Sequence, residues 1–127
     1  MENNNKMSRR FSWLKRANSF GHAGRGIGKF IASEHNAWLH LAATMAVIAA
    51  GCLLKVSSGE AVGLAVAIGM VWVTEMLNTC LEKLIDFVSL ERSDDLKFIK
   101  DVAAGAVLMA SVTALAIGSF IFIPKLI

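Results

Sequence analysis

The sequence contains no tyrosine, one proline, two cysteines and few charged residues. Two cysteines are too few for a secreted scaffold that is held together by several disulfides. The lack of tyrosine and the single proline argue against a β-rich secreted module or a disordered tail. Charged residues make up 18% of the 127 residues, whereas a soluble domain carries roughly a quarter. With 55% hydrophobic residues and a mean hydropathy of +0.55, the composition predicts a single-domain, all-α membrane protein.

Three segments, 39–56, 61–73 and 102–123, contain only one charged side chain among them, Lys55. A helix needs about 20 residues to cross roughly 30 Å of hydrocarbon. The segment 61–73 is too short to do so alone, so the second span must continue through polar residues. We therefore expect membrane helices at 39–56, 61–88 and 102–123.

Lysine and arginine are retained on the cytoplasmic side of membrane proteins. Seven of them precede Glu34 and four lie between the apolar segments 61–73 and 102–123. This distribution predicts that the N-terminus and the second loop face the cytoplasm. Cys52 then lies near the outer end of the first span and Cys80 near the inner end of the second, so we expect two free thiols.

The segment 11–33 has apolar and small residues at alternating steps of four and three, which is one face of a helix. These are Trp13, Ala17, Phe20, Gly24, Ile27 and Ile31. Basic and polar residues occupy the remaining positions, which favours an amphipathic helix at the membrane interface over a helix packed on a soluble partner. We expect residues 1–10 to be disordered, and the basic cluster there to meet lipid head groups or nucleotide phosphates rather than nucleic acid.

A polar stripe runs along the second span, formed by Glu75, Asn78, Glu82 and Asp86. At about 100° per residue these side chains fall within an arc of about 80°. The helical rise places Glu75 about 9 Å inside the cytoplasmic surface, Glu82 at the interface and Asp86 in water. A carboxylate in lipid costs about 2.5–3.5 kcal/mol and normally marks a functional interior. Such a gradient suits chemistry that joins a lipid-soluble and a water-soluble reactant.

Other charged residues approach the same depth, namely Glu34 before the first span and Lys100 and Asp101 before the third. Carboxylates from three elements suit Mg²⁺, which shares its oxygen ligands with phosphates. Lys100, with Lys15 or Arg16, could hold the phosphate charge. The alternative is that the acidic residues around the second loop form only a solvated surface: Asp86, Glu91, Asp94, Asp95 and Asp101.

The residues 75–86, with Lys100-Asp101 downstream, closely resemble the signature of the prokaryotic diacylglycerol kinase family, which includes the undecaprenol kinases. The pattern of that family is Glu-x-x-Asn-[Ser/Thr]-x-x-Glu-x-x-x-Asp, followed by Lys-Asp. The resemblance extends from Phe11 to the end of the chain. Its N-terminal part is carried by Phe20, Ala23, Gly26, Ile27, Glu34, Asn36 and His40.

The resemblance implies a homotrimer of three-span subunits in the bacterial inner membrane, each with an N-terminal surface helix. It also implies an ATP- and Mg²⁺-dependent transfer of phosphate to a membrane lipid hydroxyl, in active sites shared between neighbouring subunits. The product would be phosphatidic acid from diacylglycerol or undecaprenyl phosphate from undecaprenol. Asn36 and His40 favour the undecaprenol branch.

The resemblance also assigns roles to residues of this chain. Glu75 would be the general base, oriented by Asn78, and Glu34 and Glu82 would hold Mg²⁺. The lipid would meet Asn36, His40 and Glu75. The nucleotide site would comprise Lys15, Arg16, His22, Glu34, Glu82, Asp86, Glu91, Lys100 and Asp101.

Two other classes of function fit a membrane carboxylate. A small ion-coupled transporter subunit could use Glu75, but it predicts polar residues across the whole second span, and the segment 61–73 offers no such series. A catalytically silent scaffold would need no acidic stripe.

Overall fold

A computed structural model describes residues 12–88, 91 and 93–127. These residues form four helices: α1 (Trp13–Ser33), α2 (His35–Leu53), α3 (Ser58–Val88) and α4 (Asp94–Leu126). The predicted all-helical architecture is confirmed, and α2, α3 and α4 are long and apolar enough to cross a membrane. The expectation of disorder in residues 1–10 lies outside the described residues.

The helices differ from the apolar segments mainly at their ends. Helix α2 begins earlier than the apolar segment 39–56 and also ends earlier than that segment does. Helix α4 extends beyond the segment 102–123 in both directions. Hydropathy indicates which part of a helix suits lipid. The ends of a helix are set instead by the hydrogen-bond partners of its terminal N–H and C=O groups.

Local caps start both of the longest helices. Ahead of α3, the Ser57 N–H donates to the Glu60 carboxylate at 2.7 Å, and the Glu60 N–H donates to the Ser57 hydroxyl at 3.3 Å, which is a capping box. Ahead of α4, the Ser93 hydroxyl accepts from the Leu96 N–H at 3.2 Å. Capping therefore lets both helices begin in polar sequence outside the apolar segments.

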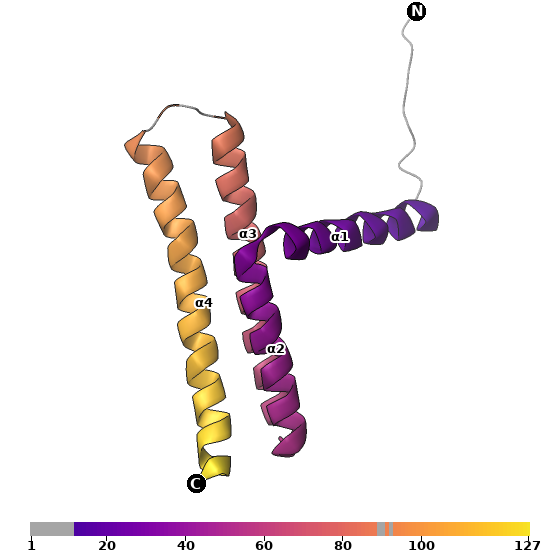
Figure 1. Ribbon diagram of the computed structural model, residues 1–127. Coiled ribbons are helices and arrows are strands. Elements are labelled where there is room, and N and C mark those ends of the chain that lie inside the picture. Colours follow the sequence, from indigo (N-terminus) through magenta and orange to yellow (C-terminus); the bar gives the residue numbers. More distant parts are fainter. Residues whose placement is uncertain (1–11, 89–90, 92) are drawn as a thin grey trace, which may run out of the picture. The chain divides into compact units, whose positions relative to one another are not determined.

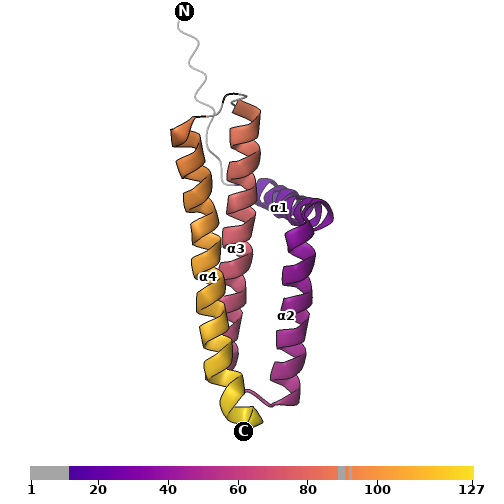
Figure 2. The ribbon, with the colours of Figure 1, turned by 60° about the vertical axis from the view of Figure 1, so that its left-hand side comes forward.

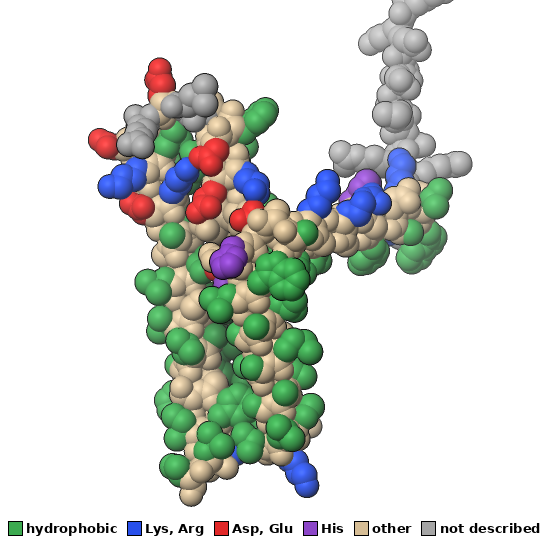
Figure 3. Space-filling view, in the orientation of Figure 1, with side chains coloured by type: hydrophobic (Ala, Val, Ile, Leu, Met, Phe, Trp, Pro, Cys, Tyr) green, Lys and Arg blue, Asp and Glu red, His purple; other side chains and the backbone are tan. Residues whose placement is uncertain are grey.

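The described residues divide into two compact units, one ending at Glu34 and one beginning at His35. The first contains α1, whose N-cap Ser12 accepts from the Lys15 N–H. Along α1, Lys and Arg side chains gather on one side and hydrophobic side chains on the other (Figure 3).

The second unit is a bundle of α2, α3 and α4, which run alternately up and down (Figure 1). Helix α3 packs along α4 and makes fewer contacts with α2. Figure 2 shows α2 and α4 separated, with α3 and α4 both continuing well beyond the first residues of α2. The ends of α3 and α4 that are joined by residues 89–93 therefore project past α2.

Few side chains are buried within a single chain. The buried apolar residues of the bundle are Ala37, Leu64, Ala67, Ile85, Ala103 and Ala110. Large apolar side chains of α4, such as Met109 and Phe120, are 74% and 83% exposed. Such a surface suits lipid or further helices rather than water.

A left-handed residue terminates α2. Lys55 has a φ of 50°, while the Val56 N–H donates to the Gly51 carbonyl at 3.1 Å and the Lys55 N–H to the Cys52 carbonyl at 3.4 Å. This is a Schellman motif, in which glycine usually occupies the position of Lys55. The turn reverses the chain from α2 into α3.

Replacing Lys55 with glycine should therefore stabilise the fold. A non-glycine residue in the left-handed region costs about 1–2 kcal/mol, and glycine avoids this cost. Part of the gain is offset because glycine loses more conformational entropy on folding. We expect Lys55→Gly to raise the free energy of unfolding by about 1 kcal/mol, measured by unfolding in detergent micelles. Lys55→Asn should gain less and Lys55→Val should lose stability. A loss with Lys55→Gly would contradict the role of this turn.

Candidate active site

Glu75 is the only charged side chain that is buried within the described part of the chain, with 6% of its surface exposed. It lies on α3 and faces His40 of α2, whose Nε2 is 2.7 Å from Glu75 Oε1. An ionised carboxylate can only accept a hydrogen bond, so in that state Nε2 carries the proton. The structure thus pairs two residues that the sequence assigned separately to the lipid site.

A second polar contact joins α2 and α3 one helical turn away. The Trp72 indole N–H donates to the Thr44 hydroxyl at 2.9 Å, and this hydroxyl donates to the His40 carbonyl at 2.7 Å. The Trp72 ring also meets the His40 ring edge-on, with centroids 6.4 Å apart. Sequence reasoning missed Trp72 and Thr44, although their spacing from Glu75 and His40 places them on the same helix faces.

Asn78 and Glu82 lie on the next turns of α3. The Asn78 amide N–H donates to Glu82 Oε1 at 3.2 Å. The Asn78 Oδ1 atom is buried and has no hydrogen-bond partner among the described residues. A buried acceptor without a partner is costly, which points to a donor or cation supplied by a ligand. Glu82 itself is exposed.

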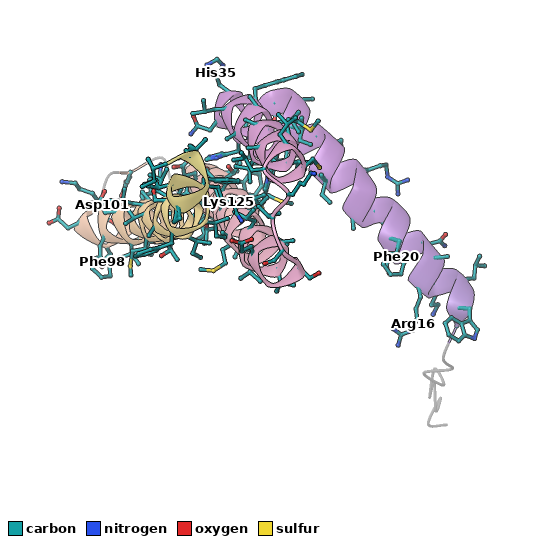
Figure 4. All side chains as sticks on the ribbon, turned by 90° about the horizontal axis from the view of Figure 1, so that it is seen from below. Arg16, Phe20, His35, Phe98, Asp101 and Lys125 are labelled. Atoms are coloured by element: carbon teal, nitrogen blue, oxygen red, sulfur yellow. The ribbon has the colours of Figure 1, made fainter. Side chains whose placement is uncertain are left out.

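Charged residues gather where α3 and α4 project beyond α2 (Figure 3). Lys100 Nζ of α4 lies 2.6 Å from Asp86 Oδ1 of α3, and both side chains are substantially exposed. Glu91 is also exposed, and Figure 4 places the exposed Asp101 on the outer side of α4. An exposed ion pair contributes little to stability. Breaking the contact between Asp86 and Lys100 so that either residue can bind a ligand therefore costs little free energy.

Of the remaining predicted residues, four belong to the first unit and Asn36 belongs to the second. His22 on α1 accepts at Nδ1 from the Arg25 guanidinium at 2.7 Å. Glu34, the last residue of the first unit, accepts from the Ser33 hydroxyl at 3.2 Å. Lys15 and Arg16 are exposed on the first turns of α1. Asn36 is exposed at the start of α2.

Two oxygen-bearing side chains of α3, Asn78 and Glu82, are of the kind that Mg²⁺ prefers as ligands. Within residues 12–88, 91 and 93–127, no three His, Cys, Asp or Glu side chains lie close enough together to hold a metal ion. Mg²⁺, however, usually takes only one or two carboxylates and completes its coordination with phosphates and water. The exposed Glu82 carboxylate beside the unpartnered Asn78 oxygen fits that requirement.

A family model described as "Prokaryotic diacylglycerol kinase" matches residues 21–122. The chain belongs to the prokaryotic diacylglycerol kinase family. The undecaprenol kinase of Bacillus subtilis (strain 168) is 40% identical over 108 residues, which are 85% of this chain and 88% of that protein. A diacylglycerol kinase of Synechocystis sp. is 34% identical over 110 residues, which are 86% of this chain and 63% of that protein. These findings confirm the predicted family and the predicted enzyme class, a lipid kinase.

The contact between His40 and Glu75 predicts coupled effects on stability. His40→Leu leaves a buried carboxylate without its partner and should lower the free energy of unfolding by about 1–3 kcal/mol. Replacing both residues with leucine should recover most of that loss, because two apolar side chains need no partners. Unfolding in micelles would test this. If the losses of free energy in His40→Leu and in Glu75→Leu simply added in the double variant, the two residues would not be coupled.

Proposed function

We propose that this chain transfers the γ-phosphoryl group of ATP to the hydroxyl of a membrane lipid, with undecaprenol as the first candidate. The Bacillus relative, which is named an undecaprenol kinase, is similar over most of both chains. The Synechocystis relative is named a diacylglycerol kinase, so diacylglycerol is the second lipid to test.

The observation that carries this proposal is the burial of Glu75 at the base of an exposed polar stripe. A lipid head-group hydroxyl can reach Glu75 from the apolar part of the bundle, whereas a nucleotide can reach the exposed residues near the ends of α3 and α4. Glu75 accepts the proton of the lipid hydroxyl. The lipid oxygen then forms a bond to the γ-phosphorus, the bond from that phosphorus to the β–γ bridging oxygen breaks, and ADP leaves. Phosphoryl transfer asks mainly for positioning and charge stabilisation.

The nucleotide site in this proposal lies where α3 and α4 project beyond the start of α2. Lys100 leaves Asp86 to contact the phosphates, while Asp86, Glu91 and Asp101 line the site. For Lys15, Arg16 and His22 of α1, the contact with the nucleotide rests on the family resemblance alone. The exposure of Lys100 and Asp86 supports this arrangement.

Glu82 would hold Mg²⁺, a role that the family resemblance implies for Glu34 as well, and Asn78 would orient Glu75 or the lipid hydroxyl. When bound, Mg²⁺ neutralises charge on the phosphates. The donor set of Glu82 and the unpartnered Asn78 oxygen supports this assignment. The Asn78 amide keeps the Glu82 carboxylate on the stripe through their hydrogen bond.

We further propose that the chain is a homotrimer in the bacterial inner membrane, with its N-terminus in the cytoplasm and α1 at the membrane interface. The excess of Lys and Arg before α2 supports this orientation. The segregated basic and apolar sides of α1 support its interfacial position. The large exposed apolar side chains support packing between subunits and contact with lipid. Family membership does not favour the ion-coupled transporter.

The decisive assay is phosphorylation of undecaprenol and of diacylglycerol by the purified protein in lipid with Mg-ATP. We expect labelled phosphate in at least one lipid, and we expect Glu75→Gln to abolish it, because the amide cannot accept the proton. Glu60→Gln is the matched control at the opposite end of α3, where the carboxylate pairs with Lys125 at 3.1 Å. Full activity of Glu75→Gln would contradict the base assignment, and no phosphorylation of either lipid would contradict the proposed function.

Lys100 offers a separate test of the nucleotide site. Lys100→Met removes a phosphate contact and should raise the KM for ATP about tenfold, which corresponds to about 1.4 kcal/mol of binding. The KM for the lipid should not change. Lys97→Met, which removes an exposed lysine one turn earlier on α4, is the control. Equal effects of the two substitutions would show that only overall charge matters.

A further inference from the structure

We infer that His40 is a positioning residue that holds the Glu75 carboxylate through Nε2, and that the contact of Trp72 with Thr44 fixes His40 for this task. The inference rests on the proposed function, because it concerns the orientation of the base. It changes the role that the family resemblance implies for His40, from contact with the lipid to contact with the carboxylate.

The geometry supports a fixed carboxylate. Glu75 Oε1 lies 2.7 Å from His40 Nε2, and 8% and 19% of the two side chains are exposed. A hydrogen bond to a carboxylate is strong when water is scarce. With Oε1 held in this way, Oε2 is the oxygen that accepts the proton of the lipid hydroxyl.

The contact between Trp72 and Thr44 restrains both the backbone and the ring of His40. The Thr44 hydroxyl donates to the His40 carbonyl and must therefore accept the Trp72 N–H with a lone pair. The Trp72 ring lies against the His40 ring with an interplanar angle of 61°. Thr44 follows His40 by about one turn of α2, and Trp72 precedes Glu75 by about one turn of α3. The two contacts therefore join α2 to α3 at two successive levels.

The need for such restraint follows from the packing of α2, the helix that carries His40. Helix α2 makes few contacts with α3, and no hydrophobic driving force holds helices together in lipid. A misplacement of a reacting group by about 1 Å can cost about 100-fold in rate. Two hydrogen-bonded levels set both the rotation of α2 and the direction in which Glu75 points.

The test separates positioning from lipid binding by steady-state kinetics in lipid. We expect His40→Leu to lower kcat about 100-fold, with the KM values for lipid and ATP essentially unchanged. His40→Gln, whose amide N–H can replace Nε2, should recover about tenfold of this loss. A raised KM for the lipid with an unchanged kcat would overturn the inference and return His40 to the lipid site.

The Thr44 and Trp72 contact has its own matched control. Thr44→Val and Trp72→Phe each remove the interhelical hydrogen bond while keeping most of the side-chain volume, and each should lower kcat about tenfold. Thr113→Val removes a hydroxyl that donates to the Met109 carbonyl of its own helix, and it should leave kcat unchanged. Equal effects of Thr44→Val and Thr113→Val would overturn the bracing role.

A spectroscopic measurement tests the contact independently of activity. Nitrogen-15 NMR of the protein in micelles should show a slowly exchanging proton on His40 Nε2, which is lost in Glu75→Leu. If the wild type lacks this proton signal, the inference is wrong even where both lipid assays succeed. A wild type that has the signal but phosphorylates neither lipid would contradict the proposed function and not the contact itself.

Discussion

The pairing of a buried carboxylate with an imidazole determines how this bundle is arranged around its site. Glu75 would be costly in lipid without a partner, and His40 of α2 supplies one at 2.7 Å. In lipid the hydrophobic effect does not drive helices together, so interhelical hydrogen bonds add to close packing in setting the rotation of one helix against another. The level at which α2 meets α3 is thus specified by the same residues that form the proposed reaction centre.

The site also depends on the unequal lengths of α2 and α3. Helix α2 spans His35–Leu53, whereas α3 spans Ser58–Val88, and α3 continues well beyond the first residues of α2 (Figure 2). Asn78 follows as a half-buried residue, and Glu82 and Asp86 on the next turns of α3 are exposed. Helix α3 therefore carries a buried carboxylate, a half-buried amide and two exposed carboxylates in that order along the chain.

The sequence was sufficient for the helical architecture and for the family, because hydropathy and the Glu75 to Asp86 pattern are local properties. The ends of α2 and α4 were less predictable, since the cap at Ser93 and the left-handed Lys55 act outside the apolar segments. The bonds from His40 to Glu75 and from Trp72 to Thr44 were not predicted. They depend on how α2 is rotated against α3, and no spacing within one helix contains that information.

The capping box at Ser57, the projecting end of α3 and the stripe between them belong to one uninterrupted rod. Its rise and rotation fix the separation of Glu75 from Asp86 at about 16 Å and their directions to within about 20°. A single-residue insertion between these positions would turn everything beyond it by about 100°, away from Lys100 of α4. The length of this stretch is therefore as tightly constrained as the identity of its polar residues.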